Sequence, residues 1–277
     1  LGLVLALAGL GFKIAAVPFH MWVPDTYEAA DTPFVAWLSV APKAAGFIVF
    51  FRLYLDGAGP AALLWVPLLS ALTTVTIVAG NLMAIPQTNV KRMLAYSGVA
   101  HIGYMLMGLA AISPGGTSMV LFYLVAYLFG NMGAFFVVQA VGSSEGSDAM
   151  TAYRGLSQRS PVLALALLVF LLSLGGIPFV AGFWAKLFVF RAVVDEQMYG
   201  LALLGAVATI VALYYYLVLS ARMYVEAPEN PAPVRVSGPL FAAILICAIG
   251  VVVMGVYPEP WVQAALEAAQ TVFQQSL

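Results

Sequence analysis

The chain has 277 residues, of which 63% are apolar and only 8% are charged, whereas a soluble domain is about 25% charged, so an ordinary water-soluble fold is excluded. A net charge of −1, one cysteine and two histidines exclude a nucleic-acid-binding surface, a disulfide framework and a metal centre rich in cysteine or histidine. Haem-attachment, Walker and dinucleotide-binding motifs are absent, so we expect an integral membrane protein that binds no metal or redox cofactor itself.

Eight apolar segments are long enough to cross a membrane as helices, which takes about 20 residues each. In chain order they lie at 1–23, 33–55, 61–83, 92–112, 118–142, 161–190, 199–223 and 238–257. The alternating pattern of outer-membrane strands is absent. The expected fold is therefore all-α: a polytopic transmembrane helix bundle over residues 1–258, followed by a short amphipathic tail over 259–277 that we expect to lie along the membrane face.

The distribution of lysine and arginine predicts how the bundle is oriented. Six basic residues near span ends fall on one side, namely Lys91, Arg92, Arg154, Arg159, Arg222 and Arg235. Only Arg52 and Arg191 fall on the other side. The first side is predicted to be cytoplasmic, which places the longest polar loop, 143–160, in the cytoplasm and both chain ends on the opposite face.

Two of the predicted spans are interrupted by similar sequences. The first contains Pro18 and the sixth contains Gly175, Gly176 and Pro178, and each proline is followed by phenylalanine. Proline lacks a backbone donor and breaks or kinks a helix. The two spans cross the membrane in opposite directions, and interrupted helices at matching places in oppositely oriented halves indicate an inverted-repeat transporter fold.

Three lysines lie within apolar surroundings: Lys13, Lys43 and Lys186. A charge at the centre of a bilayer is unfavourable by about 3 kcal/mol or more, so such residues are candidates for function. The alternative is snorkelling, in which a long side chain reaches the interface; it fits Lys186 better than Lys43, which stands midway along its span. A buried lysine can gain and lose its proton as neighbouring charges move, so the three lysines are predicted to transfer protons.

Other polar residues have two interpretations each. His101 is a candidate proton relay or a simple hydrogen-bond partner between helices, and the same alternatives hold for His20 beside Pro18. Several hydroxyl and amide side chains within the spans could either hold water wires or join helices. They are the hydroxyl-bearing residues Thr73, Thr74, Thr76, Tyr96, Ser97 and Tyr104 and the amides Asn81 and Asn131. For the acidic loop of Asp25, Glu28 and Asp31, a solvated turn is favoured over a channel mouth.

Three strings, in this order, resemble a known family. They are FKIAAVPFHMWVPDTYEAADTPFVAWLSVAPKAAGFIVFFRL, NLMAIPQTNVKRMLAYSGVAHIGYMLMG and GGIPFVAGFWAKLFVF. Together they resemble the subunit N family of proton-translocating NADH:quinone oxidoreductase (respiratory complex I) over essentially the whole chain. The sister subunits L and M share the architecture, but FHMWVPDTYE and the place of Lys13 directly after Phe12 are closer to subunit N.

The resemblance implies an antiporter-like inverted repeat and a non-redox translocase subunit, active only within its complex. It implies that Lys13 is the charge-switching lysine of the first broken helix, Lys43 the lysine of the next helix on the hydrophilic axis, and Lys186 the lysine of the second broken helix. It further implies quinone reduction elsewhere in the complex, with NADH, FMN, iron–sulfur clusters and quinone in partner subunits. The expected partners are the other membrane subunits of complex I and the lipid bilayer, and the expected location is the cell inner (plasma) membrane.

The chain departs from the family pattern in two respects. Members have about fourteen spans built from inverted repeats and this chain corresponds to the last eight, so we expect a fragment whose upstream spans hold the acidic partner of Lys13. The acidic loop reads EAADTP where the family has EGAPTP. The alternative is a subunit of a multisubunit cation/proton antiporter or membrane-bound hydrogenase, while a standalone solute carrier and a structural scaffold are less favoured.

Overall fold

The computed structural model describes residues 1–58 and 62–274. In chain order its helices are α1 Gly2–Ile14, α2 Trp22–Ala29, α3 Thr32–Leu38, α4 Ala41–Phe50, the π-helix η1 Phe51–Gly57, α5 Ala62–Ala84, α6 Val90–Ala110, α7 Pro114–Glu145, the 3-10 helix η3 Met150–Tyr153, α8 Leu156–Arg159, α9 Pro161–Gly175, α10 Ala181–Asp195, α11 Tyr199–Tyr224, α12 Gly238–Val256 and α13 Glu259–Gln274. Among the described residues, β-pairing is limited to one isolated bridge between Asn89 and Ala149. The predicted all-α class is confirmed.

Most predicted spans appear as long apolar helices. Within the described ranges, six helical segments are long and apolar enough to cross a membrane: Thr32–Tyr54, Ala62–Ala84, Val90–Ala110, Gly115–Glu145, Tyr199–Tyr224 and Gly238–Val256. The other two predicted spans are each divided into shorter helices, α1 with α2 and α9 with α10. Residue 61 of the predicted span 61–83 and residues 275–277 of the predicted tail lie outside the described residues.

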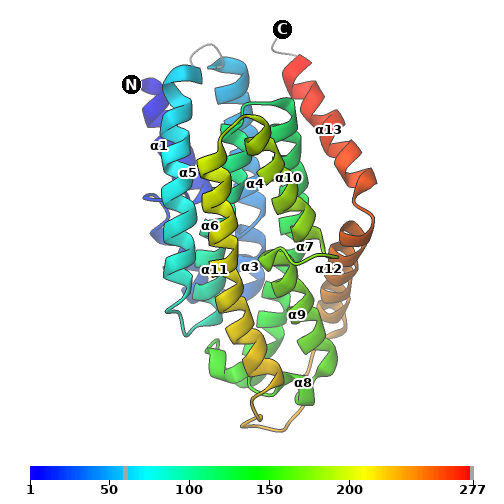
Figure 1. Ribbon diagram of the computed structural model, residues 1–277. Coiled ribbons are helices and arrows are strands. Elements are labelled where there is room, and N and C mark those ends of the chain that lie inside the picture. The colour runs from blue at the N-terminus through cyan, green and yellow to red at the C-terminus, as the bar shows by residue number, and fades with distance from the viewer. Residues whose placement is uncertain (59–61, 275–277) are drawn as a thin grey trace.

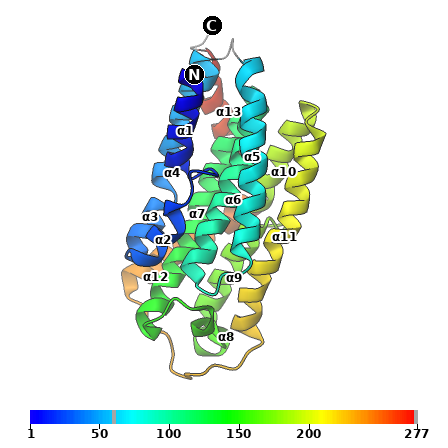
Figure 2. The same cartoon turned by 90° about the vertical axis from the view of Figure 1, so that its left-hand side faces the viewer.

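Helix α6 lies at the centre of the bundle, among α2, α5, α7, α10 and α11 (Figures 1 and 2). Almost all of its residues are buried. Its contact with α5 is close because Gly80 stands opposite Ala100, where an added Cβ atom would lie 2.5 Å from the Ala100 backbone nitrogen. Small residues at such contacts let transmembrane helices approach closely. Polar side chains on α6 therefore face protein on nearly every side.

The basic residues gather at one end of the bundle. Both chain ends lie at the opposite end, which is at the top of Figures 1 and 2. The lower end carries the connections 85–89, 146–160 and 225–237, and the six basic residues that predict the cytoplasmic side lie in or beside these connections. The segregation expected from the sequence is present, and the assignment of this end to the cytoplasm stays a prediction.

Surface labelling in cells tests that orientation. In a Cys247→Ala background, a single cysteine in the 143–160 loop should resist a membrane-impermeant maleimide applied to intact cells, because positive loops stay on the cytoplasmic side. A cysteine at the exposed Glu267 of α13 should react. Permeabilised cells provide the control, since both sites should then be labelled. Labelling of the 143–160 loop from outside intact cells would reverse the orientation.

The C-terminal segment forms a helix as expected, and its place along the membrane face stays a prediction. Tyr257 and Pro258 separate α12 from α13, which begins at Glu259 and runs along the bundle beside α7 (Figure 1). Trp261 packs against Phe129 of α7 with ring centroids 6.4 Å apart. The apolar stripe of α13 thus packs on protein, an alternative to lipid that helical periodicity alone does not distinguish.

Candidate functional site

The first interrupted helix divides beside Pro18, between α1 and α2. Ala15 adopts a left-handed backbone with φ of 69° and ends α1. The backbone N–H of Val17 is released from the helical pattern and donates instead to Thr76 Oγ1 of α5, at 3.1 Å. The Thr76 hydroxyl, which the sequence left between a water wire and a helix contact, therefore supports the break. The predicted interruption is confirmed.

The second interrupted helix divides between α9 and α10. Gly176 follows the last residue of α9 with φ of 82°, a conformation that glycine adopts much more readily than other residues. The two half-helices are joined across the gap by Ser173, whose Oγ accepts a hydrogen bond from the Gly182 backbone N–H at 3.0 Å. The two interrupted helices run in opposite directions through the bundle (Figure 2), as the inverted-repeat pattern predicts.

Lys186 lies at the second break. It belongs to α10, but its Nζ donates a hydrogen bond of 3.2 Å to the carbonyl of Gly175 at the end of α9. A lysine ammonium is favourable there because the carbonyl end of a helix carries partial negative charge. The side chain is buried, with 3% of the residue exposed, so Lys186 does not snorkel to the end of its span.

Lys43 lies beside a third discontinuity, which is not one of the two predicted breaks. The span Thr32–Tyr54 is divided into α3 and α4, and Val40 between them has φ of −123° and ψ of −61°. Lys43 follows in the first turn of α4 and is only 1% exposed. Its Nζ has no hydrogen-bond partner among the described residues. The interior of the bundle thus holds an ammonium group with unused donors.

Aromatic and imidazole side chains connect the two buried lysines. Lys43 Nζ lies 5.9 Å from the ring centroid of Tyr127. The Tyr127 ring lies 5.1 Å from the His101 ring, which lies 6.1 Å from the ring of Tyr104. The Tyr104 ring lies 4.7 Å from Lys186 Nζ. These five residues form a buried line, called the lysine–histidine line below.

His101 is at the middle of this line and makes two hydrogen bonds. Its Nδ1 lies 2.8 Å from the hydroxyl of Tyr123, and its Nε2 lies 3.3 Å from the hydroxyl of Tyr216. The Tyr216 hydroxyl also lies 2.5 Å from Ser97 Oγ. A neutral imidazole has one donor and one acceptor nitrogen, and a hydroxyl can serve either. Both ring nitrogens are therefore held by groups that accommodate either tautomer.

The sequence analysis named Tyr104 but missed three other tyrosines of this site, Tyr123, Tyr127 and Tyr216. Tyr216 belongs to α11, and its hydroxyl contacts His101. Tyr123 and Tyr127 lie four residues apart on α7 and share one face of that helix, as residues at this spacing do. That spacing, continued by Asn131, is the signal that could have identified a polar stripe on α7.

A small cavity opens beside His101 and the second break. It has a volume of about 10 Å³ for the centre of a water-sized sphere and is lined by Tyr123, Tyr127, Ser173 and Gly182, among others. A single water molecule needs roughly 10–15 Å³ by this measure and two or more polar partners. Room for one water molecule therefore lies between the imidazole and the gap in α9 and α10.

Lys13 lies apart from the lysine–histidine line. It is in the last turn of α1 and is exposed, while its stem lies against α4 at Gly46, whose added Cβ would be 3.5 Å from Lys13 Cγ. His20, after the first break, is buried next to Tyr96 with ring centroids 6.4 Å apart. Its Nδ1 has no hydrogen-bond partner within the described part of the chain. The structure thus brings together Lys43, His101 and Lys186, but not Lys13.

The acidic segment after the first break is helical as far as Ala29, and its carboxylates are exposed. Asp25 and Glu28 lie on α2, and each carboxylate contacts Arg92 Nη1 of α6 at 2.7 Å. Exposed ion pairs contribute little to stability individually, although two carboxylates on one guanidinium fix the direction of α2. These residues link α2 to α6 at the basic end of the bundle.

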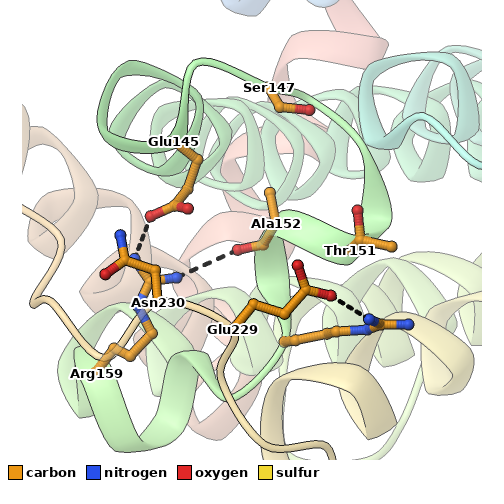
Figure 3. Close-up of a pocket in the computed structure, with 8 residues that line it drawn as sticks. Glu145, Ser147, Thr151, Ala152, Arg159, Glu229 and Asn230 are labelled. Atoms are coloured by element: carbon orange, nitrogen blue, oxygen red, sulfur yellow. Dashed lines mark hydrogen bonds and ion pairs between the residues drawn. The ribbon is translucent and has the colours of Figure 1, made fainter.

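A polar pocket of about 160 Å³ lies at the same end (Figure 3). Arg159 contacts the carboxylate of Glu145 and donates to the carbonyls of Ala152 and Ala232. Arg154, which also lines the pocket, pairs with Glu229 and with Glu226. Because these carboxylates pair with both guanidinium groups, the pocket joins loops and has no excess positive charge to attract an anion.

Proteins of known sequence are similar to the whole chain. It is 47% identical over 276 residues to NADH-quinone oxidoreductase subunit N of Heliobacterium modesticaldum, and the alignment covers 99% of this chain and 58% of that protein. It is 44% identical over 274 residues to subunit N of Moorella thermoacetica, again covering 99% and 58%. The chain thus spans 58% of the length of these curated relatives. The predicted resemblance to subunit N is confirmed.

Solved structures have the same fold. A chain of respiratory complex I from Thermus thermophilus with bound aureothin superposes with a TM-score of 0.82 at 34% identity, covering 95% of this chain and 58% of that one. A chain of the archaeal membrane-bound sulfane sulfur reductase gives 0.86 at 28% identity, covering 95% and 54%. A chain of the Mrp complex from Dietzia superposes with a TM-score of 0.91 at 21% identity, covering 99% of this chain and 60% of that one. At this low identity the similarity is evidence for the fold alone.

The family model described as the transmembrane part of NADH:quinone oxidoreductase and Mrp antiporter subunits matches residues 1–212. This range contains both interrupted helices and the whole lysine–histidine line. The chain therefore belongs to the NADH:quinone oxidoreductase/Mrp antiporter transmembrane family, and it is a multi-pass membrane protein.

Proposed function

We propose that this chain is part of a proton-translocating membrane subunit of an NADH:quinone oxidoreductase. The observation that carries the proposal is the lysine–histidine line, in which two lysines buried within the bundle are joined by titratable or hydroxyl-bearing side chains. A buried lysine without function would be unfavourable in the membrane. The similarity to subunit N proteins supports the proposal.

In this proposal Lys43 and Lys186 store protons and His101 passes them on. A proton released by one lysine leaves it neutral and changes the electrostatic field at the other, so the two charge states are coupled. The gaps between the rings exceed hydrogen-bond length and require water molecules, for which the cavity beside His101 has room. Lys13 is proposed as a further proton-transfer residue that acts together with segments outside this chain.

The redox chemistry is proposed to lie in partner subunits. In the described residues, His, Cys, Asp and Glu side chains do not gather in groups of three or more that could hold a metal ion. NADH, FMN, iron–sulfur clusters and quinone would then belong to other subunits of complex I, and this non-redox chain would respond electrostatically to quinone reduction. Its proposed partners are the neighbouring membrane subunits, in the plasma membrane of a bacterial cell.

An alternative function is supported by two comparisons. The membrane-bound sulfane sulfur reductase, an archaeal respiratory membrane complex, has a chain with the same fold at 28% identity, and the matching family model also covers Mrp antiporter subunits. The relatives of higher identity are subunit N proteins. We therefore favour the NADH:quinone oxidoreductase, and the identity of the co-purifying subunits separates the two alternatives.

Purification from native membranes tests the proposed function. The tagged protein should co-purify with flavin- and iron–sulfur-containing subunits, and membrane vesicles should acidify in response to NADH and quinone. Deleting the gene should remove this acidification, while acidification driven by ATP in the same vesicles provides the control. Co-purification with antiporter subunits alone, together with unchanged NADH-driven acidification in the deletion strain, would contradict the proposal.

A further inference from the structure

A buried hydrogen bond joins α7 to the discontinuity that precedes Lys43. Asn131 of α7 donates from Nδ2 to Ser39 Oγ at 2.7 Å, and Ser39 Oγ donates to the Ala36 carbonyl at 2.8 Å. Asn131 and Ser39 are both fully buried. The Ser39 hydroxyl thus uses its proton within α3 and accepts its second hydrogen bond from another helix.

This hydrogen bond lies where the backbone of the span lacks regular helical hydrogen bonds. Pro42 has no N–H with which to bond the carbonyl of Leu38, four residues before it, and Val40 departs from helical dihedrals. The Ser39–Asn131 hydrogen bond therefore supplies a side-chain contact at a point where helical hydrogen bonds are missing. Polar side chains commonly stabilise broken transmembrane helices in this way.

The same two elements also hold Lys43 and Tyr127. Ser39 and Lys43 are four residues apart in the broken span, and Tyr127 and Asn131 are four residues apart on α7. Ser39 contacts Asn131, while Lys43 Nζ lies 5.9 Å from the Tyr127 ring. The contacts form two rungs between the span and α7, so the Ser39–Asn131 rung fixes the height of Lys43 relative to Tyr127.

Lys43 itself has no direct hydrogen bond that would fix its position. Its Nζ is unpartnered among the described side chains and backbone groups, and the Tyr27 and Tyr127 rings are its aromatic neighbours, each with its centroid 5.9 Å from Nζ. The location of the ammonium is thus set by the backbone of α4, and the Ser39–Asn131 hydrogen bond holds the end of α3, two residues before α4 begins.

We infer that Asn131 is a positioning residue for Lys43, acting through Ser39 and the break between α3 and α4. The inference rests on the proposed function of Lys43 in proton transfer. Without the hydrogen bond, the start of α4 can shift relative to α7, and the gap between Lys43 and Tyr127 changes. Misplacement of a reacting group by about 1 Å can slow its reaction by a hundredfold.

Volume-matched variants test the inference, with protons pumped per NADH oxidised as the readout. Threonine and valine have nearly the same shape, but only threonine keeps the hydroxyl. Ser39→Thr should therefore keep most of the pumping ratio, while Ser39→Val and Asn131→Leu should each lower it by roughly tenfold. The double variant should be no worse than either single variant, because both remove the same contact.

The control is Ser118→Ala, which removes a buried hydroxyl that donates only to the Gly115 carbonyl of its own helix and should leave the ratio unchanged. Because the ratio is normalised to the NADH oxidised by the same vesicles, a change in the amount of assembled complex alone does not alter it. Equal ratios for Ser39→Thr and Ser39→Val, or a normal ratio for Asn131→Leu, would overturn the positioning role. Lys43→Met in the same series separates the positioning role of Asn131 from the proposed proton transfer by Lys43, since normal pumping by that variant would contradict the proposed function itself.

Discussion

Replacing Lys43 with methionine is expected to lower NADH-driven proton pumping by at least about tenfold while the complex still assembles. Methionine matches the length and apolar stem of lysine but cannot bind a proton. The site is fully buried, and removing a charge from the bilayer interior should not impair folding. Lys43→Arg should also impair pumping, because arginine keeps its charge but does not release a proton at physiological pH.

The measurement combines vesicle acidification, NADH oxidation and a native gel that reports assembly. Arg191→Met is the matched control, since Arg191 is exposed on α10 and, among the described residues, pairs with Asp195 one helical turn away, at 3.7 Å. This variant should pump normally. An assembled Lys43→Met complex with near-normal pumping would remove Lys43 from the proton path and leave it a structural residue.

Much of the fold could be predicted because membrane helices obey strong constraints. Backbone groups in lipid must be satisfied internally, so the apolar segments had to be helices. Pro18 and the Gly175–Gly176 pair marked the two breaks, since proline and glycine have well-defined backbone effects. The third discontinuity, at Val40, was not predicted. Pro42 lies within the first turn of α4, and a proline in the sequence is compatible either with a kink in a continuous helix or with the start of a new helix.

The partners of the buried residues could not be predicted in the same way. Lys43 and Lys186 stood out because lysine is rare in apolar segments. Tyr216 and Asn131 did not, since tyrosine and asparagine also join helices without further function. Their contacts, with His101 and Ser39 respectively, depend on how separate helices face one another. Hydrophobic periodicity along one helix does not determine that arrangement.

Replacing Gly182 with alanine is expected to disrupt the second break and to have a large effect for so small a change. An added Cβ atom would overlap the carbonyl oxygen of Ser173, which belongs to the backbone of α9 and cannot rotate away. The half-helices would have to separate, which would also break the hydrogen bond from the Gly182 N–H to Ser173 Oγ. Overpacking of this kind lowers the free energy of unfolding by about 1–3 kcal/mol.

The displacement should also reach the proton path, because Lys186 lies one helical turn after Gly182 and bonds the Gly175 carbonyl at the end of α9. We therefore expect Gly182→Ala to lower both the thermal unfolding temperature of the purified complex and its pumping ratio. Gly200→Ala is the control, since an added Cβ at Gly200 has no neighbour within 4 Å and alanine favours a helix over glycine by about 1 kcal/mol. Normal stability and pumping in Gly182→Ala would mean that the two half-helices tolerate separation. The contact between Gly182 and Ser173 would then not hold Lys186 in place.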